Sequence, residues 1–337
     1  MTHETNSFKV SVIIPAQNRE QTLPEVLHAI REDPSVYEII VVDDASTDST
    51  VRISRELGAM TITLESNHGA NYCRNLGASH ASGDIFLFLD SDVVIRPEAI
   101  AELRRALSNG NVDAIVGLYS AHHRHPELAS QYKNLWIRYS YLRSHQSLDW
   151  IFGAVAAIRA GTFRKAGGFN REFYVKQGGE DLELGKRMTR SQYRIRLEPA
   201  VEVEHLKQHT LRSLLKNDYD RSQGFVRLAL KLGQFGTSFR RGFVNIYPGF
   251  AYSVPLAWLI FLTGLSGLWR TEYWWGTLAS TALYTVINVP FLAYYSRQRP
   301  MTELPAIIGI MFLDHLVCAA GSVRGILSFL FSPRALR

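Results

Sequence analysis

The sequence has few cysteines, and it contains no internal repeat or low-complexity tract. Its two cysteines, Cys73 and Cys318, are far apart along the chain, so no disulfide is expected. The first nine residues, Met1 to Lys9, are polar and lack the apolar stretch of a signal peptide. Nothing in the chain resembles a nucleic-acid-binding module, although the formal net charge is +6. These absences argue against a disulfide-stabilised fold and against nucleic acid as a partner.

Charge is also missing from long stretches of the carboxyl-terminal third. Gly249 to Trp269 and Tyr273 to Ser296 contain no charged residue. Each is long enough to cross the ~30 Å hydrocarbon layer of a membrane as a helix. Tyr and Trp gather at the ends of these segments, as in a membrane-interface belt. Leu304 to Phe331 is a third apolar segment, interrupted by an Asp, a His and an Arg. We expect two transmembrane helices, and a third segment that either spans the membrane or re-enters it.

A basic segment precedes these apolar stretches. Leu211 to Arg241 carries seven Lys and Arg residues against two Asp residues, and its apolar residues recur at helical spacing. This pattern is typical of an amphipathic helix on an anionic membrane surface, with a helix packed on the preceding domain as the alternative. We therefore divide the chain into a domain over residues 1–210, an amphipathic basic segment over 211–246 and a membrane domain over 247–337. Attraction to an anionic membrane surface accounts for the net positive charge of the chain.

The distribution of positive charge predicts the orientation in the membrane. Arginines at positions 240–241 and 297–299 favour loops on the cytoplasmic side, which leaves residues 270–272 outside. We therefore expect a multi-pass protein of the cytoplasmic (inner) membrane whose amino-terminal domain faces the cytoplasm. Three crossings would place the carboxyl terminus outside, although Arg334 and Arg337 favour the cytoplasm.

The amino-terminal part alternates apolar strands with helix-length segments. Strands are expected over Val10–Ile14, Tyr37–Val42, Met60–Leu64 and Ile85–Leu89, and helices over Thr22–Arg31, Ser49–Leu57 and Gly69–His80. Strands that are apolar throughout predict an α/β fold with a Rossmann-like, mostly parallel sheet that is covered on both faces. Such sheets bind ligands at the carboxyl ends of their strands.

Polar residues follow three of the expected strands, at residues 15–20, at Asp43-Asp44 and at Asp90-Ser91-Asp92. Asp90 and Asp92 come directly after five apolar residues, and one residue separates them. Two carboxylates so placed can share one Mg²⁺ or Mn²⁺ ion, with phosphate oxygens as its remaining ligands. The alternative is that one Asp caps the next helix and the other is solvated.

Several short motifs follow one another between residues 8 and 210. They are Val12-Ile13-Ile14-Pro15-Ala16-Gln17-Asn18, Val41-Val42-Asp43-Asp44-Ala45-Ser46-Thr47-Asp48, Asn67-His68-Gly69, Cys73-Arg74-Asn75-Leu76-Gly77, Asp90-Ser91-Asp92, Gly167-Gly168-Phe169, Gly179-Glu180-Asp181 with Leu184 and Arg187, and Pro199-Ala200 with His205. In this order and at this spacing they resemble the motifs of an inverting family-two glycosyltransferase of GT-A fold, and the resemblance covers roughly residues 8 to 210.

This resemblance implies a nucleotide-sugar donor. Residues that would bind the donor are Pro15, Ala16, Asn18 and Glu20 around the nucleoside, Asp43 or Asp44 at the base, Arg74 at the base or phosphates, and Asp90 and Ser91 beside the diphosphate. Asp92 and Asp90 would hold the metal ion, which would neutralise charge on the departing nucleoside diphosphate. His205 would complete the metal shell or touch the diphosphate, with a plain surface histidine as the alternative. A solvated helix residue is the alternative for Arg74.

The resemblance also implies an acceptor and a base. Asp181 would take the proton from an acceptor hydroxyl, and Glu180 would be its neighbour or contact the acceptor. The acceptor would be a lipid, a lipid-linked sugar or a growing cell-surface glycan. A polyprenyl phosphate is the alternative acceptor, but a phosphate is already anionic and needs no base, so Glu180-Asp181 favours a hydroxyl. The sequence leaves the donor sugar, the nucleoside and the oligomeric state open.

Two other functions compete with glycosyl transfer. The sequence Asp90, Asp92, Val94 formally matches the nucleophile motif of haloacid-dehalogenase-type phosphatases. That motif ends the first strand of its domain, whereas here three strands precede it. A catalytically inactive membrane scaffold of the same fold is the second rival, and the retention of both Asp92 and Asp181 argues against it.

Overall fold

The computed structural model describes residues 8–143, 147–170, 180–236 and 246–331. The chain divides into two compact units. The sheet unit comprises Met1–Arg124, His145–Lys176 and Glu180–Lys207, and the helical unit comprises His125–Ser144, Gln177–Gly179 and Gln208–Arg337. Residues 125–144 therefore leave the sheet unit in mid-sequence and pack with the carboxyl-terminal helices.

Four parallel strands form one half of the sheet, in the order β3-β2-β1-β4. They are β1 (Val10–Ala16), β2 (Val36–Asp43), β3 (Met60–Thr63) and β4 (Ile85–Leu89). The helices between them are α1 (Leu23–Arg31), α2 (Thr50–Glu56) and α3 (Ala70–His80). All seven elements lie within two residues of the predicted bounds. Helix α3 lies close against this half of the sheet, since a Cβ at Gly77 would stand 2.5 Å from Ile13 Cγ2.

The other half of the sheet is mixed. It contains β5 (Val93–Ile95), β6 (Ala114–Tyr119), β7 (Ser147–Leu148), β8 (Val155–Arg159) and β9 (Ile195–His205), with α4 (Pro97–Ser108), α6 (Ala160–Lys165) and α7 (Glu180–Arg190). Strand β8 is antiparallel to both β4 and β6, whereas β6 and β9 are parallel. The prediction of a mostly parallel sheet is therefore correct only for the first half, because β8 enters between β4 and β6 in the opposite direction. Apolar strands do not distinguish these two directions when both faces are covered.

The core of the sheet unit lies around the central strands. Every residue of β1, β4 and β6 is buried, which explains why these strands read as continuous apolar segments. The aromatic rings of Phe86, Phe88, Phe163 and Phe169 pack against one another on one face. This rigid centre fixes the position of the loops that leave the carboxyl ends of β1, β2 and β4.

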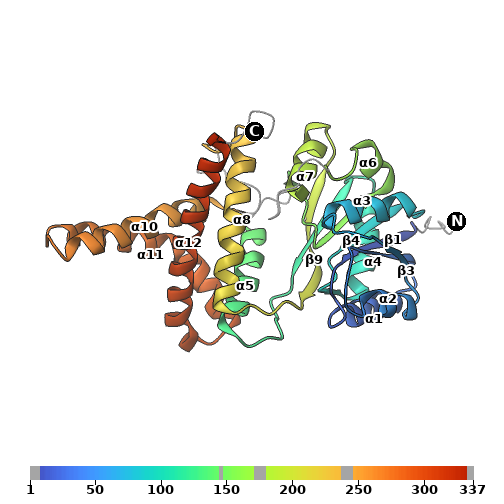
Figure 1. Ribbon diagram of the computed structural model, residues 1–337, viewed down its shortest axis with the longest axis horizontal. Coiled ribbons are helices and arrows are strands. Elements are labelled where there is room, and N and C mark those ends of the chain that lie inside the picture. The colour runs from blue at the N-terminus through green and yellow to red at the C-terminus, as the bar shows by residue number, and fades with distance from the viewer. Residues whose placement is uncertain (1–7, 144–146, 171–179, 237–245, 332–337) are drawn as a thin grey trace. The chain divides into compact units, whose positions relative to one another are not determined.

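The helical unit contains α5 (Leu128–Leu142), α8 (Leu211–Lys231), α10 (Pro248–Gly267), α11 (Tyr273–Gln298), a short 3₁₀ turn (Met301–Glu303) and α12 (Leu304–Phe331). Thr210 caps α8, because its hydroxyl accepts a hydrogen bond from the Ser213 N–H while its own N–H donates one to the Ser213 hydroxyl. Helices α8 and α12 lie side by side, and α10 and α11 form a hairpin (Figure 1). Residues 211–231 of the basic segment thus form a helix that packs on another helix, and positions 237–245 of the segment lie outside the described residues.

Three helices of the described residues are long and apolar enough to cross a membrane: α10, α11 and α12 with its preceding turn. Large apolar side chains on α10 and α11 are exposed, and at the tip of the hairpin Trp269 and Trp275 are 75% and 76% exposed. Exposed apolar surface of this extent is expected where a protein meets lipid. The prediction of apolar helices suited to membrane anchoring is confirmed.

Candidate active site

The two loops that follow β1 and β2 are tied to each other. Asn18 has a φ of 51°, and its side-chain oxygen accepts a hydrogen bond from the Thr47 N–H at 2.8 Å. Its own N–H donates to the Ser46 hydroxyl at 2.8 Å. Glu20 accepts a hydrogen bond from the Ser49 N–H at 3.1 Å. The predicted nucleoside-binding loop is therefore held in place by the loop after β2, with Asn18 and Glu20 exposed.

Two other predicted nucleoside contacts, Pro15 and Ala16, are the last residues of β1 and are buried. The carboxylates of Asp43 and Asp44 have different hydrogen-bond partners. Asp44 accepts the N–H groups of His68 and Gly69 at 2.7 and 2.8 Å, so both of its oxygens position the start of α3. Asp43 accepts only the Ser46 N–H, and within the described residues its other oxygen is buried without a hydrogen-bond partner.

Arg74, on α3, lies in the interior rather than on the helix surface. Its guanidinium donates to the Asp90 carboxylate at 2.6 Å, to the Gly153 carbonyl at 3.2 Å and to the Asn71 side chain at 3.0 Å. A Cβ on Gly153 would lie 2.8 Å from one guanidinium nitrogen, so only glycine permits this approach. The alternative of a solvated Arg74 is wrong, because the residue is 7% exposed. Its contact with the donor stays a prediction.

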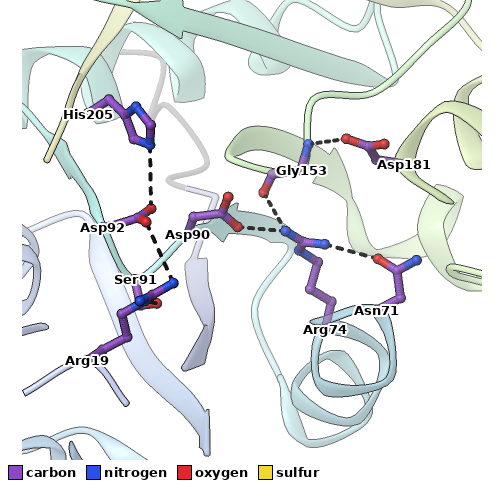
Figure 2. Close-up of polar contacts among 9 residues, drawn as sticks. All are labelled: Arg19, Asn71, Arg74, Asp90, Ser91, Asp92, Gly153, Asp181 and His205. Carbon is purple, nitrogen blue, oxygen red and sulfur yellow. Dashed lines mark hydrogen bonds and ion pairs between the residues drawn. The ribbon is translucent and has the colours of Figure 1, made fainter. Parts of the chain in front are cut away.

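Asp181 is the second residue of α7. Its carboxylate accepts the Gly153 N–H at 3.0 Å and the Leu182 N–H at 3.0 Å. Gly153 thus connects two predicted site residues, because its N–H meets Asp181 while its carbonyl meets Arg74 (Figure 2). The side chain of Glu180 lies outside the described residues.

Asp92 lies after β4 between two cationic or titratable side chains. Its oxygens are 3.8 Å from the Arg19 guanidinium and 3.9 Å from the His205 Nε2 atom (Figure 2). Both distances exceed that of a hydrogen bond, so the carboxylate keeps capacity for a further ligand. Between the two acids, Ser91 accepts hydrogen bonds from Arg19 at its hydroxyl and from Thr22 at its carbonyl.

The structure adds residues that the sequence did not single out for the site. The Tyr119 ring stacks on His205, with ring centroids 4.5 Å apart. His123 is 4% exposed, and its ring centroid lies 6.4 Å from that of His205. Arg19 completes this group. Its position in the loop after β1 is the sequence signal that could have indicated it.

The side chains near Asp92 offer few ligands for a divalent ion. Within the described residues no group of three or more His, Cys, Asp or Glu side chains could hold a metal alone. Asp92 and His205 form a pair, and Arg74 engages one oxygen of Asp90. Mg²⁺ and Mn²⁺ are commonly held by one or two carboxylates together with substrate phosphates. The pair therefore fits an ion that arrives with a diphosphate.

Cys73 supplies no nucleophile to this site. It is buried in α3, and burial together with the charge of Asp44 raises the pKa of its thiol to about 12.

Residues 11–166 match the family model "Glycosyl transferase family 2", and residues 134–210 match "N-terminal domain of galactosyltransferase". The chain is 40% identical over 99 residues to 4,4'-diaponeurosporenoate glycosyltransferase of Staphylococcus haemolyticus, a match that covers 28% of this chain and 26% of that protein. It is 36% identical over 105 residues to undecaprenyl-phosphate 4-deoxy-4-formamido-L-arabinose transferase of Salmonella choleraesuis. That match covers 28% of this chain and 32% of the relative. The chain thus spans about a quarter to a third of the curated relatives that it matches.

Two solved structures have a similar fold. The mannosyltransferase PcManGT of Pyrobaculum calidifontis, in complex with GDP-Man and Mn²⁺, aligns with a TM-score of 0.59 and 18% identity over 96% of this chain and 87% of that chain. GalNAc-T7 with UDP, GalNAc and Mn²⁺ aligns with a TM-score of 0.50 and 16% identity over 67% of this chain and 48% of that chain. Residues 11–166 of the chain thus match the glycosyl transferase family 2 model, the fold is similar to that of solved GT-A glycosyltransferases, and apolar helices follow in the same chain.

Proposed function

We propose that the protein is a membrane-anchored, inverting glycosyltransferase that moves a sugar from a nucleotide-sugar donor to a hydroxyl of a lipid, lipid-linked sugar or cell-surface glycan. The observation that carries this proposal is the position of Asp92. It follows the buried strand β4 inside the region that matches the family, and it lies beside His205 and Arg19 at distances that leave room for a ligand. Membrane attachment rests on the apolar helices.

Donor binding divides between two places in the sheet unit. Asp43 is the better acid to receive an N–H from the base, because Asp44 already uses both oxygens to hold the start of α3. Asp92, with His205 and with Asp90 beside it, would hold a divalent ion, Mg²⁺ or Mn²⁺, that neutralises charge on the diphosphate. Arg19 adds a positive charge on the other side of Asp92. This arrangement stabilises the leaving group where negative charge develops.

The acceptor's proton is the task proposed for Asp181. Its two backbone hydrogen bonds fix the position of the carboxylate that would act as the general base. The connection through Gly153 and Arg74 to Asp90 holds this base in a fixed relation to the metal-binding residues. One base and one metal suit a single displacement with inversion at the anomeric carbon.

A polyprenyl phosphate is the second candidate acceptor. It is favoured by one observation, namely that the Salmonella relative is named as an undecaprenyl-phosphate transferase. Such an acceptor would leave Asp181 with the structural role alone.

The test uses full-length protein in lipid nanodiscs and a panel of nucleotide sugars, with lipid extract, polyprenyl phosphate or no acceptor. Release of nucleoside diphosphate is measured for the wild type, for Asp92→Asn and for Glu56→Gln, an exposed acid on α2 that pairs with Arg52. We expect acceptor-dependent release that Asp92→Asn and a chelator abolish and that Glu56→Gln preserves. Normal turnover of Asp92→Asn would remove the metal from the mechanism. Absence of release with every donor and acceptor would contradict the proposed activity.

A further inference from the structure

Helices α8 and α12 pack against each other through their backbones. A Cβ at Gly321 would stand 2.3 Å from the Tyr219 carbonyl oxygen, and one at Gly325 would stand 2.8 Å from the Gln223 carbonyl oxygen. Two glycines four residues apart allow such close contact between helices. One turn earlier, the Cys318 thiol is 3.9 Å from the Asp218 carbonyl oxygen. Positions further along α8 contact positions further along α12, so the two helices run parallel to each other.

Helix α8 cannot enter the hydrocarbon layer. Its charged residues are Arg212, Lys216, Asp218, Asp220, Arg221, Arg227 and Lys231. Lys216 is 79% exposed in its side chain and pairs with Asp220 at 3.3 Å. Only Asp218 is both buried and closely paired, through Lys133 on α5. Charged side chains are costly at the membrane centre, so α8 must lie in the headgroup region or in water.

The depth of α8 determines the depth of α12. From Asp314 to Gly325, α12 lies against α8, and Arg324 on its exposed side stacks over the Tyr219 ring of α8. This part of α12 must therefore share the shallow depth of α8. What remains before it, Leu304–Leu313, has ten residues and would be about 15 Å long as a helix. That length is roughly half of the ~30 Å hydrocarbon layer.

The hairpin of α10 and α11 meets α12 at a restricted place. Phe250 and Tyr284 both pack on the His315 ring, and the Trp258 indole N–H donates to the Leu316 carbonyl at 2.9 Å. Phe250 and Trp258 are about two turns apart on α10, yet they contact adjacent residues of α12. Contacts of this kind indicate crossing helices. Figure 1 shows the hairpin projecting across the direction of α8 and α12.

The helices of the hairpin are also less covered by the rest of the protein than α12 is. Of the candidate membrane span, 17% is buried in α10 and 22% in α11, against 39% in α12. Neither α10 nor α11 contains a charged residue before Arg297. Helices that are apolar on all sides and largely uncovered are suited to lipid.

We propose that the chain crosses the membrane only twice, through α10 and α11, and that α12 lies with α8 in the interfacial region of the leaflet on the side of the sheet unit. The apolar side chains Ile308, Leu313, Val323, Leu327, Leu330 and Phe331 on the exposed side of α12 would enter the headgroup boundary. Two crossings place the carboxyl terminus on the same side as the amino terminus. This resolves the conflict of three crossings with Arg334 and Arg337, which favour the cytoplasmic side.

The test is the sidedness of both termini and of the hairpin tip in membranes of a bacterial expression host. Full-length protein carries a different epitope tag at each end, and Thr271→Cys marks the tip. Right-side-out spheroplasts and inside-out vesicles are treated with protease and with a membrane-impermeant maleimide. The untouched chain is the control for labelling, since Cys73 and Cys318 are both buried.

We expect both tags to be cleaved only in inside-out vesicles and the tip cysteine to be labelled only in spheroplasts. Cleavage of the carboxyl-terminal tag in spheroplasts would establish a third crossing and overturn the proposal. Labelling of the tip on the same side as both tags would show that the hairpin does not cross. As an independent measurement, nitroxide labels at Val323→Cys on α12 and Val286→Cys on α11 are compared for depth. The proposal requires the first to be shallow and the second to lie near the bilayer centre.

Discussion

Each unit of the molecule contains a buried polar network, and the two networks differ in how completely they are closed. In the helical unit, Lys133 donates to both oxygens of Asp218 at 2.6 and 2.7 Å, and the Tyr132 hydroxyl donates to Asp314 at 2.9 Å. In the sheet unit, hydrogen bonds connect Asp90 through Arg74 and Gly153 to Asp181, whereas the Arg19 and His205 side chains stand 3.8 and 3.9 Å from the Asp92 carboxylate.

The two networks illustrate two roles of buried charge, namely holding helices together and binding a ligand. Burial alone would raise the pKa of Asp218, but the charges of Lys133 and Arg221 outweigh it and the pKa of Asp218 is lowered. The charge is thus matched by protein groups, and the network joins α5, α8 and α12. In the sheet unit, by contrast, one buried oxygen of Asp43 has no hydrogen-bond partner among the described residues, and the Arg19 and His205 side chains stand beyond hydrogen-bond distance from the Asp92 carboxylate. The closed network holds helices together, and we propose that the incomplete one takes up the donor.

The largest expected effect is on stability, from opening the closed network. Lys133→Met leaves Asp218 buried without its cation, and we expect a loss of about 3–5 kcal/mol in the free energy of unfolding. Unfolding is followed by tryptophan fluorescence in mixed micelles of increasing SDS content. This signal reports mainly on the helical unit, because Trp136, Trp258, Trp269, Trp274 and Trp275 all lie there.

The double variant Lys133→Met with Asp218→Leu is the matched control for that loss. It removes both charges, so most of the stability should return. Lys216→Met should cost only about 0–1 kcal/mol, because its pair with Asp220 is exposed. A single variant as stable as the wild type would show that the Lys133–Asp218 pair does not hold the helices together.

The second effect falls on turnover, from altering the open network. Asp181→Asn keeps the size of the side chain but removes the proposed base, so transfer to a hydroxyl should fall by about 10²-fold or more. Donor affinity, measured by calorimetry, should remain nearly unchanged because Asp43, Asp90 and Asp92 are untouched. Loss of donor binding together with turnover would assign Asp181 to the donor site or to the fold. Full turnover would indicate a phosphate acceptor, which needs no base.

The sequence predicted the strands and helices of the first half of the sheet unit better than the side-chain hydrogen bonds that connect them. Apolar strands and capped helices are local signals, so the first seven elements could be placed within two residues of their bounds. The bridge from Arg74 through Gly153 joins residues 79 positions apart, and only the packing of α3 beneath the segment before β8 creates it. Likewise, one could not choose between Asp43 and Asp44 from the sequence, because the choice depends on where the His68-Gly69 backbone lies.

In the helical unit, too, the sequence predicted the elements but not the contacts between them. Hydropathy identified α10, α11 and α12 as membrane-compatible helices. It could not show that α12 packs along a charged helix, because that contact brings together residues about 100 positions apart, such as Asp218 and Cys318. Depth in the membrane depends on the partner of a helix as well as on its own composition.

The smallest expected effect on stability comes from a third network, which is exposed to solvent. It tests whether burial makes the interactions in the other two networks strong. Arg124 donates to Glu25 at 2.6 Å and to Glu204 at 2.7 Å, and its own side chain is 37% exposed. Its hydrogen bonds lower the pKa of Glu204, against a smaller opposing effect of burial. A carboxyl whose pKa is lower in the folded state stabilises the fold above its unfolded pKa of about 4.3. That stabilisation is lost as the pH falls through the lowered pKa.

We therefore expect Arg124→Gln to cost less than about 1 kcal/mol at pH 7, since solvent screens exposed pairs. The difference between the wild type and the variant should shrink as the pH falls from about 5 toward 3, because protonated Glu204 no longer attracts the guanidinium. The measurement is the midpoint of chemical unfolding of the full chain at a series of pH values, with Arg52→Gln as a control at another exposed pair. A loss of the same size as that from Lys133→Met would mean that the number of hydrogen bonds, and not burial, sets the strength of these networks.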